Sequence, residues 1–103
     1  MSLLAQQLIA ENKATKNPFL DLGNCGLTEL PEELFDCVWL ENLNLGTWSY
    51  DEKEQVWQTS KNKEQQNQLK TLHHNNKSMA LLTKLRILVL MITKLWIFFT
   101  YKD

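Results

Sequence analysis

Apolar residues recur at helical spacing at the start of the chain. Three leucines and an isoleucine stand at this spacing among Gln and Glu residues: Leu3, Leu4, Leu8 and Ile9. This is the pattern of an amphipathic helix that buries one stripe. Asn17-Pro18 ends the pattern, because the residue before a proline is disfavoured in helical conformation. The pattern predicts a helix over roughly residues 2–14, within an N-terminal segment of residues 1–17.

The hydrophobic period changes after this segment. Leu20-Asp21-Leu22 alternates apolar and polar side chains, as a short strand with one buried face does. The same unit returns as Leu43-Asn44-Leu45, and the two units start 23 residues apart (43 minus 20). A spacing in the low twenties predicts a repeat architecture built on strands.

The residues between and within these two units carry a family resemblance. Ten of them fall at constrained positions: Leu20, Leu22, Cys25, Leu27, Leu30, Pro31, Leu34, Leu40, Leu43 and Leu45. The run LDLGNCGLTELPEELFDCVWLENLNL resembles the leucine-rich-repeat family, and its L-T-x-L-P turn is similar to that of the bacterial members. The resemblance implies an α/β fold, a short leucine-rich-repeat solenoid in which these ten residues are the structural positions. Each repeat would be a strand plus a helical return, the first return starting at Pro31.

The repeat pattern weakens after its second strand. Residues 47–66 are polar and charged, with aromatic side chains at Trp48, Tyr50 and Trp57, and L-x-x-L spacing resumes only from Asn67. We therefore expect an N-terminal capping helix followed by about two and a half repeats. The expected segments are 1–17 for the capping helix, 18–46 for the first repeat and the start of the second, 47–66 for a long inserted loop, 67–95 for degenerate repeats and 96–103 for an apolar tail.

The C-terminal stretch supports two interpretations. Met79 to Tyr101 is mostly apolar and has about the length of a transmembrane helix. Lys84, Arg86 and Lys94 interrupt it, and a charge near the centre of a span costs about 2.5–3.5 kcal/mol. We favour an uncovered repeat end over a membrane span. Its last strand would expose an apolar row that promotes self-association through this C-terminal edge: Ile87, Val89 and Met91.

Composition and motifs exclude several classes of function. The 103 residues carry 11 Lys and Arg against 12 Asp and Glu and form no basic stripe, so a nucleic-acid partner is not expected. The adjacent His73 and His74 diverge in a turn, and Cys25 and Cys37 are too few for a four-ligand zinc site. No nucleotide-binding or hydrolase motif occurs. We expect no cofactor, no metal and no catalytic residue, and the absence of a secretory signal predicts a cytoplasmic protein.

These observations predict a non-catalytic module that binds a protein or peptide. The predicted contact residues are polar strand positions and loop aromatics: Asp21, Asn42, Asn44, Trp48, Tyr50 and Trp57. Trp and Tyr are the side chains that most often carry interface energy, although these aromatics could instead fold back over the core. One alternative is the N-terminal fragment of a larger regulatory repeat protein, for example a repeat-containing GTPase. A small membrane-anchored protein is the other.

Overall fold

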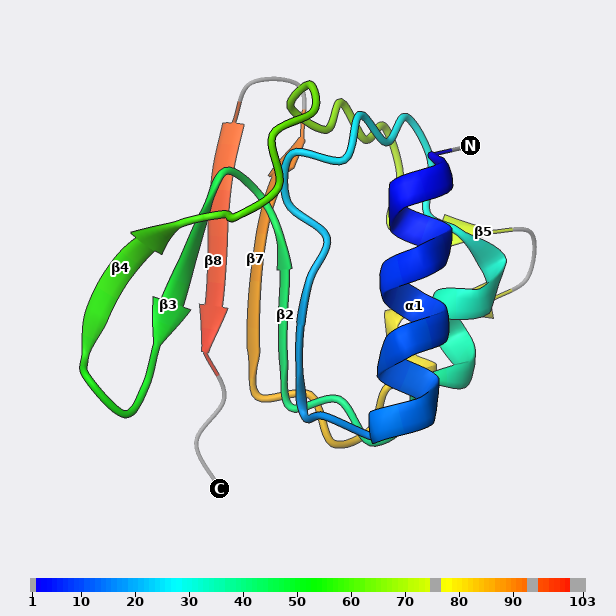
Figure 1. The fold of residues 1–103 in the computed structure, drawn as a ribbon, viewed down its shortest axis with the longest axis horizontal. Coiled ribbons are helices and arrows are strands. Elements are labelled where there is room, and N and C mark those ends of the chain that lie inside the picture. The colour runs from blue at the N-terminus through cyan, green and yellow to red at the C-terminus, as the bar shows by residue number, and fades with distance from the viewer. Residues whose placement is uncertain (1, 75–76, 93–94, 101–103) are drawn as a thin grey trace.

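A four-stranded sheet organises the chain in a computed structural model that describes residues 2–74, 77–92 and 95–100 (Figure 1). Its strands are β1 (Phe19–Asp21), β2 (Asn42–Leu45), β7 (Ile87–Ile92) and β8 (Leu95–Thr100), in the spatial order β1-β2-β7-β8. The first three strands are parallel, and β8 runs antiparallel to β7. The register aligns Leu20 with Leu43 and Leu43 with Leu88, so leucines of three strands share one face.

Helix α1 (Leu3–Thr15) lies beside β1. It begins where the Ser2 hydroxyl accepts a hydrogen bond from the Ala5 amide at 3.1 Å. It ends where Lys16 adopts a left-handed conformation (φ 58°) and donates its backbone N–H to the Asn12 carbonyl. The structure therefore places the predicted N-terminal helix against the first strand.

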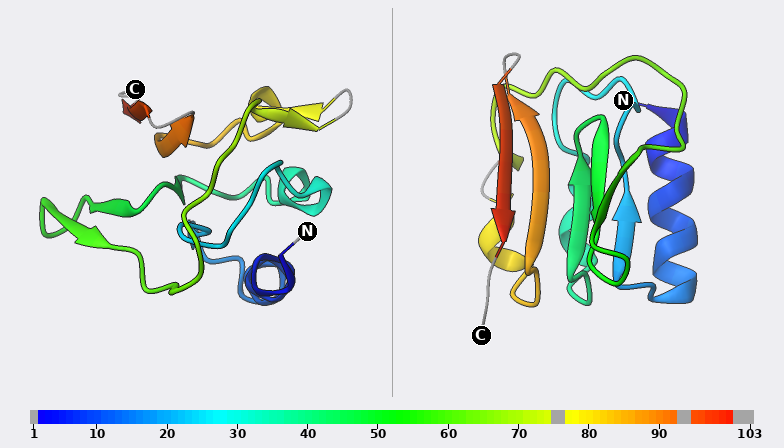
Figure 2. Two further views of the ribbon diagram at one scale, coloured as in Figure 1. Left: turned by 90° about the horizontal axis from the view of Figure 1, so that it is seen from above. Right: turned by 90° about the vertical axis from the view of Figure 1, so that its left-hand side faces the viewer.

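Short 3₁₀ helices return the chain between the parallel strands. Helix η1 (Glu32–Asp36) follows Pro31 and buries Leu34 and Phe35. Strands β5 (His73–His74) and β6 (Lys77–Ser78) form a small hairpin, and η2 (Met79–Leu81) leads toward β7. Viewed from above, α1, η1 and this hairpin lie on one side of the sheet (Figure 2). This side is the interior face of the sheet.

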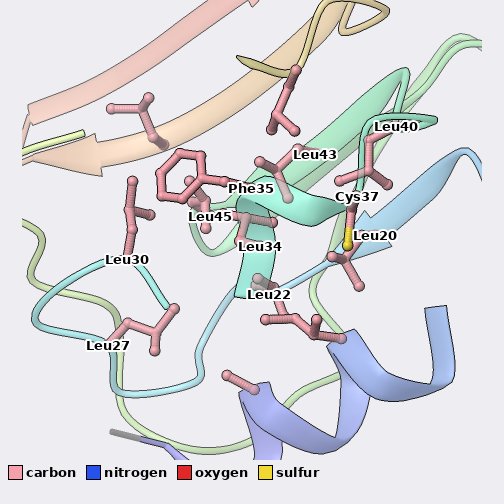
Figure 3. Packing of buried hydrophobic residues seen from close by; sticks show 14 of the residues in the cluster. Leu20, Leu22, Leu27, Leu30, Leu34, Phe35, Cys37, Leu40, Leu43 and Leu45 are labelled. Atoms are coloured by element: carbon pink, nitrogen blue, oxygen red, sulfur yellow. The ribbon is translucent and has the colours of Figure 1, made fainter. Parts of the chain in front are cut away.

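One hydrophobic core fills the space between the sheet and these returning segments. Figure 3 shows leucines of β1, η1 and β2 pointing into a shared interior. All ten residues assigned to structural repeat positions are buried: Leu20, Leu22, Cys25, Leu27, Leu30, Pro31, Leu34, Leu40, Leu43 and Leu45. The regular spacing of leucines therefore corresponds to a single packed core.

The predicted leucine-rich-repeat solenoid is wrong. The described residues form a small compact α/β structure with one α-helix and both parallel and antiparallel pairing. A solenoid of this kind stacks like units side by side. Here the fourth strand, β8, runs antiparallel to β7, and it is formed mostly by residues 96–100 of the segment predicted as an apolar tail.

The predicted exposure of the last parallel strand is also wrong for two of its three residues. Ile87 and Val89 are only 1% and 2% exposed. Strand β3 (Trp48–Asp51) lies against β7, which lies between β2 and β8 in the sheet. The Met91 side chain lies outside what the structure describes. Across residues 2–74, 77–92 and 95–100, no helix combines the length and apolar character needed to cross a bilayer.

Candidate interaction surface

The segment predicted as a loop contains an antiparallel hairpin. Strand β3 pairs with β4 (Val56–Thr59), and the register places Tyr50 opposite Trp57 and Trp48 opposite Thr59. Residues directly opposite each other, or two apart on one strand, share a face. The rings of Tyr50 and Trp57 are 5.2 Å apart between centroids and inclined at 57°. This geometry is favourable for an aromatic pair.

The outer face of this hairpin exposes large aromatic side chains. Trp48 is 44% exposed and Trp57 is 45% exposed, whereas Tyr50 is partly buried. Val56 is also 44% exposed, but it is adjacent to Trp57 on β4 and therefore points to the other face of the hairpin. We call Trp48, Tyr50 and Trp57 the aromatic surface.

The hairpin lies on the side of the sheet away from η1 (Figure 2). The Asn42 side-chain amide donates a hydrogen bond to the Tyr50 carbonyl at 3.0 Å. Arg86, which directly precedes β7, binds the Glu52 carboxylate with both terminal nitrogens, at 3.0 and 2.6 Å. Strand β2 and the residue that precedes β7 therefore each contribute a contact that holds the hairpin near the sheet.

Asp21 fixes the base of the hairpin. Its carboxylate accepts hydrogen bonds from the Ser60 hydroxyl at 2.8 Å, the Asn44 amide at 2.9 Å and the Lys61 backbone N–H at 3.3 Å. Ser60 is 2% exposed, and its own N–H donates to the Thr47 carbonyl at 2.7 Å. The two ends of the hairpin are thus tied together and to β1.

The turns that follow β1 and β2 approach each other closely beside this base. A side chain at Gly23 would collide with the carbonyl oxygen of Gly46, so glycine is required at this position. The Asn62 amide donates to the carbonyls of Asp21 and Gly23, at 3.0 and 2.8 Å. This packing keeps the loop after β4 in place.

Two hollows flank the hairpin. One has a volume of about 310 Å³ and lies beside Phe19, Asn42, Tyr50 and Gln58. The other, of about 280 Å³, lies between α1, β1 and β4. Both are large enough for a side chain of a bound peptide.

The buried thiols are not activated. Burial, followed by the negative charges of Asp21 and Glu64, raises the pKa of Cys25 to about 12. Burial also raises the pKa of Cys37. Both side chains are therefore protonated near neutral pH, and a thiol is a far weaker nucleophile than a thiolate. Within the part of the chain that the structure describes, no group of three or more His, Cys, Asp and Glu side chains is arranged to hold a metal ion.

Family models, curated proteins and solved structures give no match to this chain. The resemblance to leucine-rich repeats consequently stays a prediction from the sequence. Function must be inferred from the arrangement of the side chains.

The structure separates the six predicted contact residues into two groups. Trp48, Tyr50 and Trp57 lie together on one hairpin. Asp21 and Asn42 contact the hairpin or its base, whereas the Asn44 side chain binds Asp21 and the Gly46 N–H. Asn44 is 0% exposed, so its side chain is buried and cannot contact a partner.

Sequence reasoning missed the residues that position the hairpin. Ser60 and Asn62 bind Asp21 and its neighbours from about forty residues away in the sequence, which no local pattern reveals. One strand of the hairpin does show a sequence pattern. WSYD alternates aromatic and polar residues, as a half-buried strand does, whereas VWQT has two apolar residues followed by two polar ones.

Proposed function

We propose that the chain is a non-catalytic interaction module that binds a protein or peptide in the cytoplasm through the aromatic surface. The observation that carries this proposal is the exposure of Trp48 and Trp57 on a hairpin whose base is held by Asp21 and Ser60. Exposed aromatic side chains on an ordered element bind at little entropic cost, because few rotatable bonds are immobilised.

The geometry favours a partner segment with apolar side chains. Such a segment would pack against the indole rings of Trp48 and Trp57, which share one face of the hairpin. The Tyr50–Trp57 ring contact supports this arrangement, because it restricts both rings before a partner arrives.

A non-catalytic role is supported by the state of the reactive groups near the hairpin. Cys25, the nearest thiol to Asp21 in sequence, has a raised pKa. The Glu52 carboxylate is engaged by Arg86, and the Asp21 carboxylate is engaged by Ser60 and Asn44. These carboxylates therefore have structural partners.

Selection of peptides against the immobilised full chain, from a displayed random library, tests the proposal. We expect the selected peptides to lose at least about tenfold in affinity for a Trp48→Ala/Trp57→Ala variant, the effect of removing interface anchors. Val38→Ala is the matched control, because Val38 is 49% exposed and lies outside the hairpin. Calorimetric titration supplies the affinities.

Three outcomes would contradict the proposal. The selection could yield no binding peptide. Selected peptides could bind the double variant as tightly as the parent chain. The double variant could also lose thermal stability while its affinity is unchanged, which would assign the aromatic residues a structural role.

A further inference from the structure

The β3–β4 hairpin has a strand edge that no other strand covers. In this two-stranded sheet β4 pairs with β3, and no further strand pairs with β4 among residues 2–74, 77–92 and 95–100. Strand β3 lies against β7, whereas all four residues of β4 are exposed. The outer edge of β4 is therefore the accessible edge of the hairpin.

The hydrogen-bond pattern shows which residues of β4 face outward. In an antiparallel pair of strands, hydrogen-bonded and non-hydrogen-bonded residue pairs alternate. Ser60 donates its N–H to the Thr47 carbonyl. The next pair along the hairpin, Trp48 and Thr59, is therefore of the non-hydrogen-bonded kind. The backbone N–H and C=O of Thr59 thus point away from β3, whereas those of Gln58 point toward it.

A strand added at this edge would bring its side chains to the aromatic surface. Thr59 lies opposite Trp48, and Trp57 lies opposite Tyr50, so these side chains share one face of the hairpin. Every second side chain of an added strand would lie on the same face, beside the exposed indole of Trp57. The intervening side chains would point to the opposite face.

A hollow provides the room for a chain next to Thr59. It is the hollow of about 280 Å³ between α1, β1 and β4, and Thr59 and Glu11 are among the residues that line it. Because α1 bounds this space, it admits a single extended chain but not the folded body of a second copy. The surroundings of the edge therefore favour a peptide as its occupant.

We propose that the outer edge of β4 binds an extended peptide as a third strand, with apolar side chains at alternate positions on the face of the aromatic surface. This inference rests on the proposed function and adds the conformation and the side-chain pattern of the partner. When a peptide adds to a sheet edge, main-chain hydrogen bonds supply affinity and alternate side chains supply specificity. A third strand would also stabilise the hairpin, because two strands alone are marginally stable.

Two labelled nonapeptides of equal composition provide the probe. In one peptide leucines alternate with threonines, and in the other the leucines are grouped at one end. In fluorescence anisotropy with the full chain, we expect the alternating peptide to bind at least about tenfold more tightly, the effect of burying about two further methylene groups. The reason is that only the alternating peptide can place all its leucines on one face of a strand.

Backbone methylation of the alternating peptide tests the strand pairing itself. One derivative carries methyl groups on the amide nitrogens of its leucines, and the other carries them on those of its threonines. Only one of these two sets of amides can face β4 in a strand, since successive residues point their backbone groups to opposite sides. One derivative should therefore lose binding, and the other should bind nearly as tightly as the parent peptide.

Thr59→Pro tests the edge on the side of the protein. Proline lacks the outward-facing N–H and is tolerated on an edge strand, so the pairing of β4 with β3 should be kept. Binding of the alternating peptide should fall at least about fivefold, the effect of one lost hydrogen bond. Thr59→Val is the matched control, because it keeps the N–H, and it should bind nearly as the parent chain does.

Amide hydrogen exchange of the unaltered chain provides a second measurement. The alternating peptide should slow the exchange of the Thr59 amide, which would donate to the added strand. The Gln58 amide should change little, because it already faces β3.

Several results would overturn the inference. The alternating peptide could fail to bind, or could bind no better than the grouped one. The two methylated derivatives could bind equally, or Thr59→Pro could bind as Thr59→Val does. Slower exchange confined to residues 95–100 would assign the peptide to the edge of β8. Self-association in sedimentation that Thr59→Pro abolishes would assign the edge of β4 to a second copy.

The same variants separate this inference from the proposed function. Loss of peptide binding in Trp48→Ala/Trp57→Ala but not in Thr59→Pro would refute strand addition and leave the aromatic surface as the binding site. Loss in Thr59→Pro but not in the double variant would support strand addition and refute the aromatic surface.

Discussion

Single asparagine side chains satisfy several buried backbone groups at once. Asn67 is 4% exposed, and its amide nitrogen donates to the carbonyls of Leu22 and Leu45, at 2.9 and 2.8 Å. Its amide oxygen accepts from the N–H groups of Cys25 and Leu27, at 3.2 and 2.8 Å. One side chain therefore completes the hydrogen bonding of the turns that follow two neighbouring strands.

Asn67→Ala should lower the free energy of unfolding by at least about 2 kcal/mol, because a buried backbone group left without a partner costs about 1–3 kcal/mol. Chemical denaturation monitored by circular dichroism measures this loss. Gln68→Ala is the control, since the Gln68 side chain is exposed. Equal stability of the two variants would contradict the structural role of Asn67.

The raised pKa of Cys25 predicts a pH dependence of stability. Its pKa is about 12 in the folded chain, against an ordinary value of 9.0. Between these values the unfolded chain loses the thiol proton and the folded chain keeps it, so stability falls as pH rises. Below pH 9 the thiol is protonated in both states, and this contribution to stability is fully present.

The comparison that tests this prediction is between the parent chain and Cys25→Ser. We expect the denaturation midpoint of the parent chain to fall more between pH 8 and pH 10 than that of the variant. The raised pKa of Cys37 and the titration of other groups act in both proteins and cancel in the comparison. Parallel slopes in the two proteins would show that Cys25 is accessible to solvent.

Among the elements, the β3–β4 hairpin depends most on a few polar contacts. Ser60→Ala removes the hydroxyl that binds Asp21 and should cost about 1.5–3 kcal/mol, the usual value for a hydrogen bond to a charged group. Hydrogen exchange of residues 47–60 should accelerate in this variant. Ser49→Ala is the matched control, because the Ser49 hydroxyl makes one long contact of 3.5 Å to the Gln58 carbonyl. Similar exchange in both variants would contradict the role of Ser60.

The elements that local pattern could predict are those whose signals are short-range. The helix stripe ending at Pro18, the strand at Leu20 and the proline before η1 each mark an element that the structure contains. Strand β8 was missed, since no Gly, Asn or Asp stands between Met91 and Leu95 to indicate a hairpin turn. Its pairing with β7 could not be distinguished from an apolar tail.

The candidate site was predictable only in part for a related reason. The aromatic side chains of Trp48, Tyr50 and Trp57 stand out in a polar segment. Asp21 binds both Asn44 and Ser60, and Ser60 reaches it only because the hairpin crosses the sheet. Contacts between residues this far apart in sequence leave no periodic signal.

For the whole molecule, stability rests mainly on the buried cluster to which leucines of β1 and β2 belong. Leu22 and Leu43 are 0% exposed and belong to the same buried cluster. Leu22→Ala or Leu43→Ala should each cost about 2–5 kcal/mol, the usual range for a buried leucine. A domain of this size has little more stability than that to lose, so either variant should be largely unfolded at room temperature by circular dichroism.

Leu81→Ala is the control for this prediction, since Leu81 is 46% exposed. It should retain a native spectrum and nearly the parent melting temperature. A native spectrum and an unchanged midpoint for Leu22→Ala would show that the leucines of β1 and β2 do not form the core that the structure describes.

The hydrogen bond from the Ser60 N–H to the Thr47 carbonyl brings the two ends of the β3–β4 hairpin together. Because the chain leaves and re-enters the body of the molecule at adjacent points, the intervening segment can vary in length and sequence at a small entropic cost. Evolution, or an engineer, could exchange this segment for another and leave the leucine interior unaltered. The hairpin sequence, and with it the partner that the hairpin binds, can therefore change while the rest of the fold is kept.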